Sequence, residues 1–146
     1  MEKYYTINEI SIMTGLTTRT IRNYLKSGLI NAEKVNGIWM FSHEDFSDML
    51  ANPAIKPSIQ AKNNAVVYDF LVDNKKKINK ICTIIDLYID DTESNETSEF
   101  FCNTINSLSE TGELSFKFEK YGRNVRVILS GTEETVIDIL NKYYNR

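Results

Sequence analysis

The sequence is poor in the residues that most catalytic and metal sites use. Its 146 residues include two cysteines, Cys82 and Cys102, and one histidine, His43. The cysteines lie apart in apolar surroundings and form no C-x-x-C pair, which favours two buried, reduced thiols over a zinc site. His43 falls in the first turn of a predicted helix, where we expect it to be exposed. Because a glycine-rich phosphate loop and a nucleophile elbow are also missing, we expect no enzyme, no cofactor and no bound metal.

Long apolar runs and a leader segment are missing as well. No apolar stretch approaches the ~20 residues that a membrane-spanning helix needs. The first ten residues, MEKYYTINEI, contain no basic segment followed by an apolar one, which a secretory signal requires. We therefore expect a cytoplasmic protein with no membrane partner.

An excess of basic charge is absent from the chain as a whole, whose formal net charge is −3. Residues 1–77 carry 10 basic and 8 acidic side chains, whereas residues 78–146 carry 7 basic and 12 acidic ones. An acidic total argues against a surface that binds nucleic acid everywhere, but it allows one local basic patch. The asymmetry predicts two parts with different tasks.

Two short helices joined by a glycine turn are predicted near the N-terminus. Thr6 and Glu9 form a T-x-x-E capping box, and Gly15 can end the first helix in the left-handed conformation. A second helix begins at Thr17 or Thr18, just beyond this turn, and the next glycine ends it. This pattern is typical of a helix-turn-helix.

The second helix has one apolar face and several polar ones. Ile21 and Leu25, four residues apart, are expected to face the core. A solvated polar face is one interpretation of the remaining side chains. The tight turn in front of the helix favours the other, in which they reach phosphates and base edges in a major groove. These side chains are Thr18, Arg19, Arg22, Asn23 and Lys26.

A hairpin and a third helix follow. Asn36-Gly37 is a strong two-residue hairpin signal, because both positions of such a turn need positive φ. Ser42 and Asp45 can cap a helix that Pro53 prevents from continuing. A helix-turn-helix followed by a hairpin and a helix is a winged helix-turn-helix.

The stretch YTINEISIMTGLTTRTIRNYLKSGLI, together with NGIWMFSHEDFSDM, resembles the DNA-binding domain of the MerR family of transcriptional regulators. It is also similar to excisionase-type helix-turn-helix modules. The resemblance covers residues 4–50, and it rests on the family pattern G-[VL]-[ST]-x-R-T-[LI]-R-x-Y and on the wing that follows it. It implies that the start of the second helix lies in the major groove, with Tyr24 and Lys26 nearer the DNA backbone.

The sequence departs from the family at two positions. Asn23 stands where a second aromatic residue is frequent, and an asparagine suits bidentate contact with adenine. Trp39 stands at a wing position that is commonly arginine, and we expect it to lie in the core. The full set of predicted DNA-binding residues is Thr17, Thr18, Arg19, Arg22, Asn23, Tyr24, Lys26, Lys34 and Asn36.

Residues 54–77 are predicted to be a linker that contains a helix from Ser58. Only about four helical turns fit there, and no heptad register persists, so the long dimerisation helix of MerR-like regulators is missing. The run Lys75–Lys77 ends this segment. It is either a solvated linker, which we favour, or a contact to the DNA backbone.

Residues 78–146 predict a small acidic β-α-β-β-α unit. The alternation of Ile81, Ile85 and Leu87 favours a strand, DDTESNET is expected to be a loop, and residues 98–110 a helix. Residues 114–129 alternate around YGRN as a hairpin does, and a last helix begins at Thr132. The carboxylates of Asp86, Asp90 and Asp91 could hold a cation, but we expect them to be solvated.

These patterns predict an α+β fold with a winged helix-turn-helix at 1–53, a linker helix at 54–77 and an α/β unit at 78–146 that dimerises or senses a ligand. The predicted function is that of a homodimeric, sequence-specific regulator of transcription that binds double-stranded DNA and has a possible small-molecule effector. Two alternatives remain open. One is an excisionase-like protein that bends DNA, and the other is a module that binds protein instead of DNA.

Overall fold

The computed structural model describes residues 3–108 and 113–146. In this part of the chain, six helices and two antiparallel sheets form an α+β fold, as predicted. The N-terminal elements are α1 (Ile7–Thr14), α2 (Thr18–Ser27), β1 (Glu33–Val35), β2 (Ile38–Met40) and α3 (His43–Ala51). They are followed by α4 (Lys56–Val72), β3 (Lys80–Tyr88), α5 (Asp91–Asn106), β4 (Ser115–Tyr121), β5 (Asn124–Thr132) and α6 (Glu133–Tyr144).

Helix caps set the boundaries of the N-terminal helices where the sequence predicted them. Thr6 and Glu9 form a complete capping box at the start of α1, and Ser42 and Asp45 form another at the start of α3. Each box satisfies backbone N–H groups that the first helical turn leaves without partners. The predicted helix-turn-helix is therefore present, and β1 and β2 form the predicted hairpin, which is called the wing below.

The turn between α1 and α2 needs glycine for two reasons. Gly15 has a φ of +79°, which side chains rarely tolerate. A Cβ atom at this position would lie 2.8 Å from the Cβ atom of Lys62 on α4. The absence of a side chain at Gly15 thus lets the helix-turn-helix pack directly against α4.

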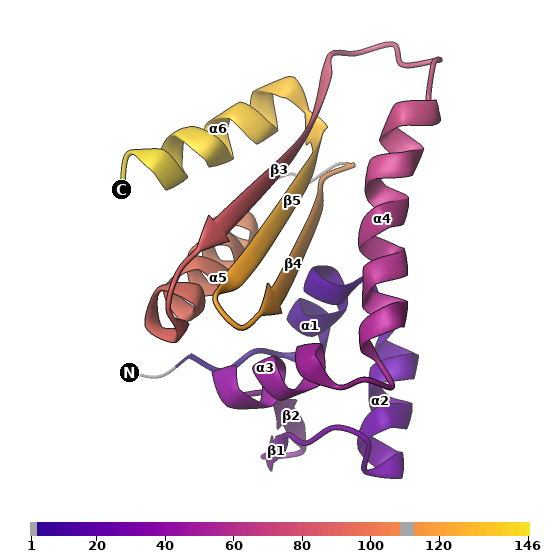
Figure 1. Cartoon of the computed structure of the whole chain (residues 1–146), viewed down its shortest axis with the longest axis vertical. Helices are drawn as coiled ribbons and strands as arrows, with labels where there is room; N and C mark the ends of the chain where they lie inside the picture. Colours follow the sequence, from indigo (N-terminus) through magenta and orange to yellow (C-terminus); the bar gives the residue numbers. More distant parts are fainter. Residues whose placement is uncertain (1–2, 109–112) are drawn as a thin grey trace.

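The C-terminal sheet has the strand order β3-β5-β4, and each neighbouring pair is antiparallel. Helices α5 and α6 lie against one face of this sheet, and α4 runs along the other side of the molecule (Figure 1). Side chains of this face and of the two helices that cover it form most of the C-terminal core. They include Phe101, Phe116, Phe118, Val127, Leu129, Val136 and Ile139.

The prediction that DDTESNET is a loop was wrong, because α5 begins at Asp91 within this segment. The side chain of Asp90 caps the helix by accepting a hydrogen bond from the N–H of Glu93, at 2.8 Å. Acidic residues in a first turn also suit the positive end of the helix dipole. Ser94 and Thr97, polar in the sequence, are buried in the structure. The predicted helix at 98–110 is seen up to Asn106, and positions 109 and 110 lie outside the described residues.

One continuous core joins the helix-turn-helix to the C-terminal sheet. The ring of Phe46 on α3 packs against that of Phe118 on β4, with centroids 5.9 Å apart. The hydroxyl groups of Tyr5 and Ser98, one in each part, are hydrogen-bonded at 2.5 Å. Buried residues of both parts belong to the same apolar cluster. The helix-turn-helix part is thus fixed against the sheet by packing.

His43 also lies at this junction, so the prediction that it is exposed was wrong. Only 12% of its side chain is accessible, and its Nε2 atom lies 3.0 Å from Oε1 of Glu99 on α5. The imidazole ring makes an edge contact with Tyr5 at 5.3 Å. Its place at the start of α3 was predicted, but the helix that covers it comes from far along the chain.

Two lysines of β4 add polar contacts across the junction. The Nζ atom of Lys117 donates to the carbonyl oxygen of Ile12 at 2.8 Å, and burial lowers the pKa of this ammonium group. The Nζ atom of Lys120 lies 2.8 Å from Oδ1 of Asp91 and 3.4 Å from the hydroxyl of Ser47. These contacts restrict the orientation of α1 and α3 on the sheet.

The two thiols are free, as the sequence predicted, and they differ in exposure. Cys102 is buried and Cys82 is half-buried. Desolvation raises the pKa of Cys102 to about 12, which keeps this thiol protonated near neutral pH. Among the described residues, no helix is both long and apolar enough to cross a membrane.

The contact between Gly15 and α4 can be measured with a matched pair of variants. Gly28 has the same φ of +79° but no atom within 4 Å of an added Cβ. We expect Gly28→Ala to lower the free energy of unfolding by about 1–2 kcal/mol, through backbone strain alone. Gly15→Ala should cost a further ~1–3 kcal/mol, because Lys62 must move. Urea denaturation followed by circular dichroism measures both, and equal losses would contradict the close packing.

Because the two parts share one core, we expect a core truncation on β4 to destabilise the helix-turn-helix as well. Phe118→Ala should lower the free energy of unfolding by about 3–5 kcal/mol. Hydrogen exchange should show reduced protection of amides in α3 as well as in β5. As a control, Tyr144→Ala removes an exposed ring and should cost less than about 1 kcal/mol. Unchanged protection of α3 in the Phe118 variant would show that the two parts are energetically separate.

Candidate nucleic-acid interface

The N-terminal part presents α2 with its apolar residues inward and its polar residues outward. Ile21 is fully buried, and Leu25 and Tyr24 are half-buried against the core. On the other side of the helix, the charged and amide side chains of Arg19, Arg22, Asn23 and Lys26 are exposed. No ion pair holds these basic groups within the described part of the chain. This face is therefore available to a polyanion.

The start of α2 is fixed by Thr17. Its hydroxyl oxygen accepts a hydrogen bond from the N–H of Thr20 at 3.1 Å, and it also contacts the Thr20 hydroxyl at 2.9 Å. Helix α2 has no acidic residue in its first turn. The positive end of the helix dipole and the guanidinium of Arg19 thus lie together at the exposed end of the helix, an arrangement that favours phosphate.

The wing and the two helices form a shared hollow of about 560 Å³. Arg22 of α2 and Lys34 of β1 both line this hollow, although they are far apart in the sequence. Two predicted site residues are thus brought together at one place on the surface. The other members of the lining are Thr6, Ile7, Asn8, Gly37, Ile38 and Trp39.

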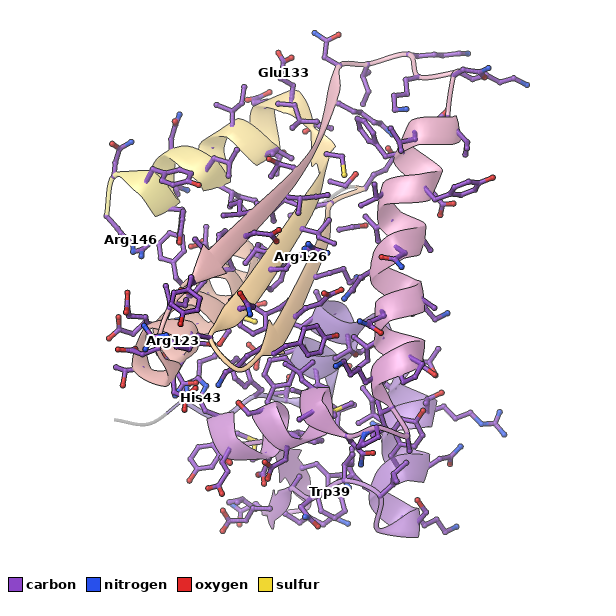
Figure 2. The ribbon with its side chains drawn as sticks, in the orientation of Figure 1. Trp39, His43, Arg123, Arg126, Glu133 and Arg146 are labelled. Atoms are coloured by element: carbon purple, nitrogen blue, oxygen red, sulfur yellow. The ribbon has the colours of Figure 1, made fainter. Side chains whose placement is uncertain are left out.

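Trp39 on the wing contacts both the core and the hollow. Its ring packs against the edge of the core, as predicted, but it remains half-buried and lines the hollow. The Nζ atom of Lys34 lies over the ring, 5.3 Å from the centroid. This cation–π contact restricts the ammonium group of a residue that lines the same hollow as Arg22. Figure 2 shows Trp39 at the end of the molecule away from the C-terminal sheet.

Two other predicted site residues, Tyr24 and Asn36, lie in different surroundings. Tyr24 is half-buried, so its ring serves the core as well as any ligand. Asn36 occupies the tip of the wing with a φ of 52°, the positive value that the hairpin turn requires. It lines a second, apolar hollow on the outer face of the wing, together with Tyr4, Val35, Ile38 and Met40.

Two polar residues among those that line the hollow without having been predicted lie in the first turn of the domain. Thr6 and Asn8 lie at the start of α1, beside Arg22 and Lys34. The sequence identified Thr6 only as a helix cap. Asn8 gave no signal, because its position next to α2 depends on how the two helices cross.

The lysine run at the end of the linker is remote from this surface. Figure 1 shows the segment between α4 and β3 at the opposite end of the molecule from α2 and the wing. The Nζ atom of Lys76 turns back and donates to the carbonyl oxygen of Phe70 at 2.7 Å. These contacts support the interpretation of the run as a solvated linker.

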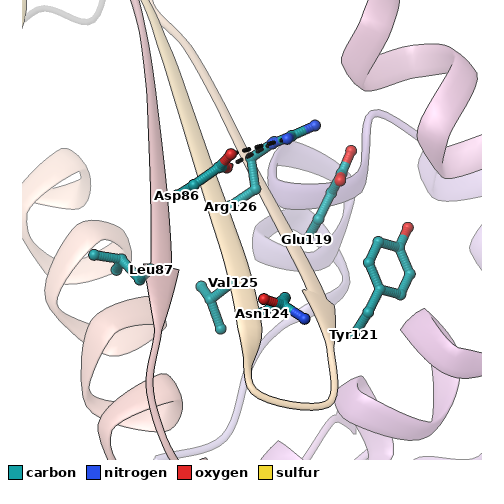
Figure 3. A pocket seen from close by; sticks show the side chains of 7 residues that line it. All are labelled: Asp86, Leu87, Glu119, Tyr121, Asn124, Val125 and Arg126. Atoms are coloured by element: carbon teal, nitrogen blue, oxygen red, sulfur yellow. Dashed lines mark hydrogen bonds and ion pairs between the residues drawn. The ribbon is translucent and has the colours of Figure 1, made fainter.

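The C-terminal unit contains a smaller hollow of about 240 Å³ (Figure 3). Arg126 and Asp86 point toward each other across it and form two hydrogen bonds, at 2.7 and 3.0 Å. The guanidinium beside it holds the pKa of the Asp86 carboxyl below its usual value. Glu119 lies next to this pair and accepts a hydrogen bond from Asn63 at 2.6 Å.

The three carboxylates that could have held a cation are engaged separately. Asp86 binds Arg126, Asp90 caps α5, and Asp91 pairs with Lys120. In the part of the chain that the structure describes, no group of three or more potential ligands is placed to hold a metal ion.

The cap at Thr17 supports the position of the candidate interface and can be tested. Thr17→Ala should lower the free energy of unfolding by about 1 kcal/mol, because the N–H of Thr20 loses its acceptor. Thr17→Ser keeps the hydroxyl oxygen and should retain most of the stability. Thermal and urea unfolding of the two variants measure the difference. If serine and alanine cost the same, the hydrogen bond does not hold the helix start.

The comparisons with known proteins agree with this geometry. A family model described as MerR HTH family regulatory protein matches residues 5–51. No curated protein and no solved structure matches the chain significantly. The matched segment contains α1, α2, the wing and α3, and this confirms the resemblance identified in the sequence. Residues 5–51 are a MerR-type helix-turn-helix domain, the DNA-binding module of a family of regulatory proteins.

Proposed function

We propose that this protein is a cytoplasmic, sequence-specific regulator of transcription that acts as a homodimer on double-stranded DNA. The observation that carries the proposal is the exposed polar face of α2, which adjoins Lys34 of the wing within a MerR-type domain. Arg19, Arg22 and Asn23 would read base edges in the major groove, and Lys26 and Lys34 would contact phosphates. No catalytic role is part of the proposal.

The acidic C-terminal unit fits this role. Residues 78–146 carry 12 acidic and 7 basic side chains, so they repel the DNA backbone. Binding is then concentrated on the N-terminal surface, and nonspecific attraction to any duplex is reduced. Homodimers of helix-turn-helix domains bind two half-sites separated by about one helical turn or a multiple of it. An inverted repeat is therefore the expected site.

The hollow of the C-terminal unit is poorly suited to a small-molecule effector. The charged groups around the hollow of the C-terminal unit already have partners, since Asp86 binds Arg126 and Glu119 accepts a hydrogen bond from Asn63. A ligand there would have to break an existing ion pair or hydrogen bond before making its own.

The apolar outer face of the wing supports a second function. Val35 and Ile38 are exposed on this face, at the tip of a hairpin that lies beside α2. Apolar side chains that enter the minor groove can unstack a base step and bend the duplex. An excisionase-like protein that bends DNA for recombination would use the wing in this way. Gel mobility of permuted sites tests this second function, since an unbent duplex would exclude it.

The test of the main proposal begins with selection of bound duplexes from a random library by the full-length protein. On the selected site, Arg19→Ala and Arg22→Ala should each weaken binding by about 1–3 kcal/mol, roughly 5- to 150-fold in Kd. Arg146→Ala removes the same charge at the far end of the chain and should leave Kd nearly unchanged. Affinity should also fall steeply as salt rises.

Two results would count against this function. No enrichment from the library at low salt would favour a module that binds protein. Enrichment with unchanged Kd in both arginine variants would show that α2 is not the recognition helix.

A further inference from the structure

Strand β3 forms an open edge of the C-terminal sheet. It is nine residues long and, within the described residues, pairs only with β5. Helices α5 and α6 cover a face of the sheet (Figure 1), and Ile84, Asp86 and Tyr88 of β3 remain exposed. A long edge strand leaves a row of backbone groups ready to pair with another strand, and proteins usually cover or disrupt such edges.

Two hydrogen bonds show which backbone groups of β3 point outward. The N–H of Ile89 donates to the carbonyl oxygen of Arg123 at 2.9 Å, and the carbonyl oxygen of Asn79 accepts from Glu133 at 3.0 Å. Both bonds continue the β3–β5 register beyond the ends of β3. In an antiparallel pair, successive residues direct their N–H and C=O groups to opposite sides. Odd-numbered residues therefore bond to β5. The even-numbered ones, Lys80, Cys82, Ile84, Asp86 and Tyr88, face the open edge.

The outward groups are complementary to those of an identical strand. If two copies of β3 meet in antiparallel fashion about Ile84, this residue forms a hydrogen-bonded pair with its own counterpart. Cys82 then lies opposite the partner's Asp86, and Lys80 lies diagonal to it on the same face. Opposite charges at cross-strand neighbours favour this register. Within one copy, Arg126 holds Asp86 and Glu113 holds Lys80. In the dimer, Lys80 of the partner would therefore join two existing ion pairs into one charged network across the strands.

Apolar side chains at the same edge are incompletely covered. Ile84 is 49% exposed, and it lies beside a hollow of about 310 Å³ that Val67, Tyr68 and Leu71 of α4 also line. On the helix-covered face, Ile81, Ile85 and Leu87 are only half-buried, because the sheet stops at β3. In the register about Ile84, Ile81 lies opposite the partner's Leu87. A second copy would therefore extend the core and close the hollow on the other face.

We propose that this protein dimerises through β3, which pairs antiparallel with β3 of a second copy about a two-fold axis at Ile84. The two three-stranded sheets then become one sheet of six strands. This inference rests on the proposed function, which requires a homodimer on DNA, and it adds the surface through which the two copies bind. Helix α2 and the wing lie at the other end of the molecule (Figure 1), so this pairing leaves both DNA-binding surfaces free.

Charge substitutions at the axis test the interface, since residue 84 faces its own copy. Ile84→Lys or Ile84→Asp places like charges opposite each other, and each should weaken self-association at least ~10-fold. Light scattering with gel filtration should give a mass of 16.8 kDa for these variants and twice that for the natural protein. An equal mixture of the two variants should recover the dimer mass, because the charges are then opposite.

Ile12→Lys is the matched control. Ile12 is 44% exposed and lies on α1, away from β3, so this variant should keep the dimer mass. Circular dichroism checks that each variant is folded. The interface is wrong if the natural protein has the monomer mass, if both Ile84 variants remain dimers, or if the mixture stays monomeric.

Library selection separates this interface from the proposed function. With the natural protein we expect an inverted repeat, and with Ile84→Lys a single half-site. A half-site in both selections would overturn the dimer and leave DNA binding intact. If the natural protein enriches no sequence while the mass measurements support the β3 interface, the DNA-binding proposal fails and the dimer stands.

Discussion

The packing of Phe46 against Phe118 is the contact on which the arrangement of the whole molecule depends. It joins a helix of the DNA-binding domain to a strand of the C-terminal sheet inside one apolar cluster. Apolar packing alone tolerates small rotations, and polar bonds at the same junction remove this freedom. These bonds are the one between the hydroxyl groups of Tyr5 and Ser98 and the one from Lys117 to the carbonyl oxygen of Ile12. Burial supplies the attraction, and the directional bonds select one orientation.

Helix α4 contacts both the helix-turn-helix and the C-terminal sheet. It is held by a close backbone approach and by a buried hydrogen bond. Lys62 of α4 packs beside Gly15, and the next residue, Asn63, is fully buried and donates to Glu119 of β4. The Oδ1 atom of Asn63 is buried and has no hydrogen-bond partner among the described residues. A buried amide that is only partly satisfied costs free energy, so this contact defines the position of α4 more than it stabilises it. The segment predicted as a linker is thus part of the packed structure.

The sequence predicted what depends on local chemistry. Capping boxes, glycine turns and the Asn36-Gly37 hairpin each depend on contacts within a few residues. The helix-turn-helix, the wing and the exposed face of α2 could therefore be predicted from the sequence. The start of α5 was missed because a polar, acidic segment looks like a loop until Ser94 and Thr97 are buried by tertiary packing. His43 was misjudged for the same reason, since Glu99 is distant in sequence. The hollow shared by Arg22 and Lys34 needed the relative placement of the helix and the wing, which no local pattern encodes.

The position of Trp39 gives the protein a built-in optical probe. It is the single tryptophan of the chain, and it lies half-buried in the hollow between α2 and the wing, under the ammonium group of Lys34. Indole emission depends on solvent contact and on nearby charge. A phosphate that drew Lys34 away from the ring would change both at once. Occupancy of the candidate interface can therefore be followed in the natural protein without any attached dye, and the signal comes from the wing alone.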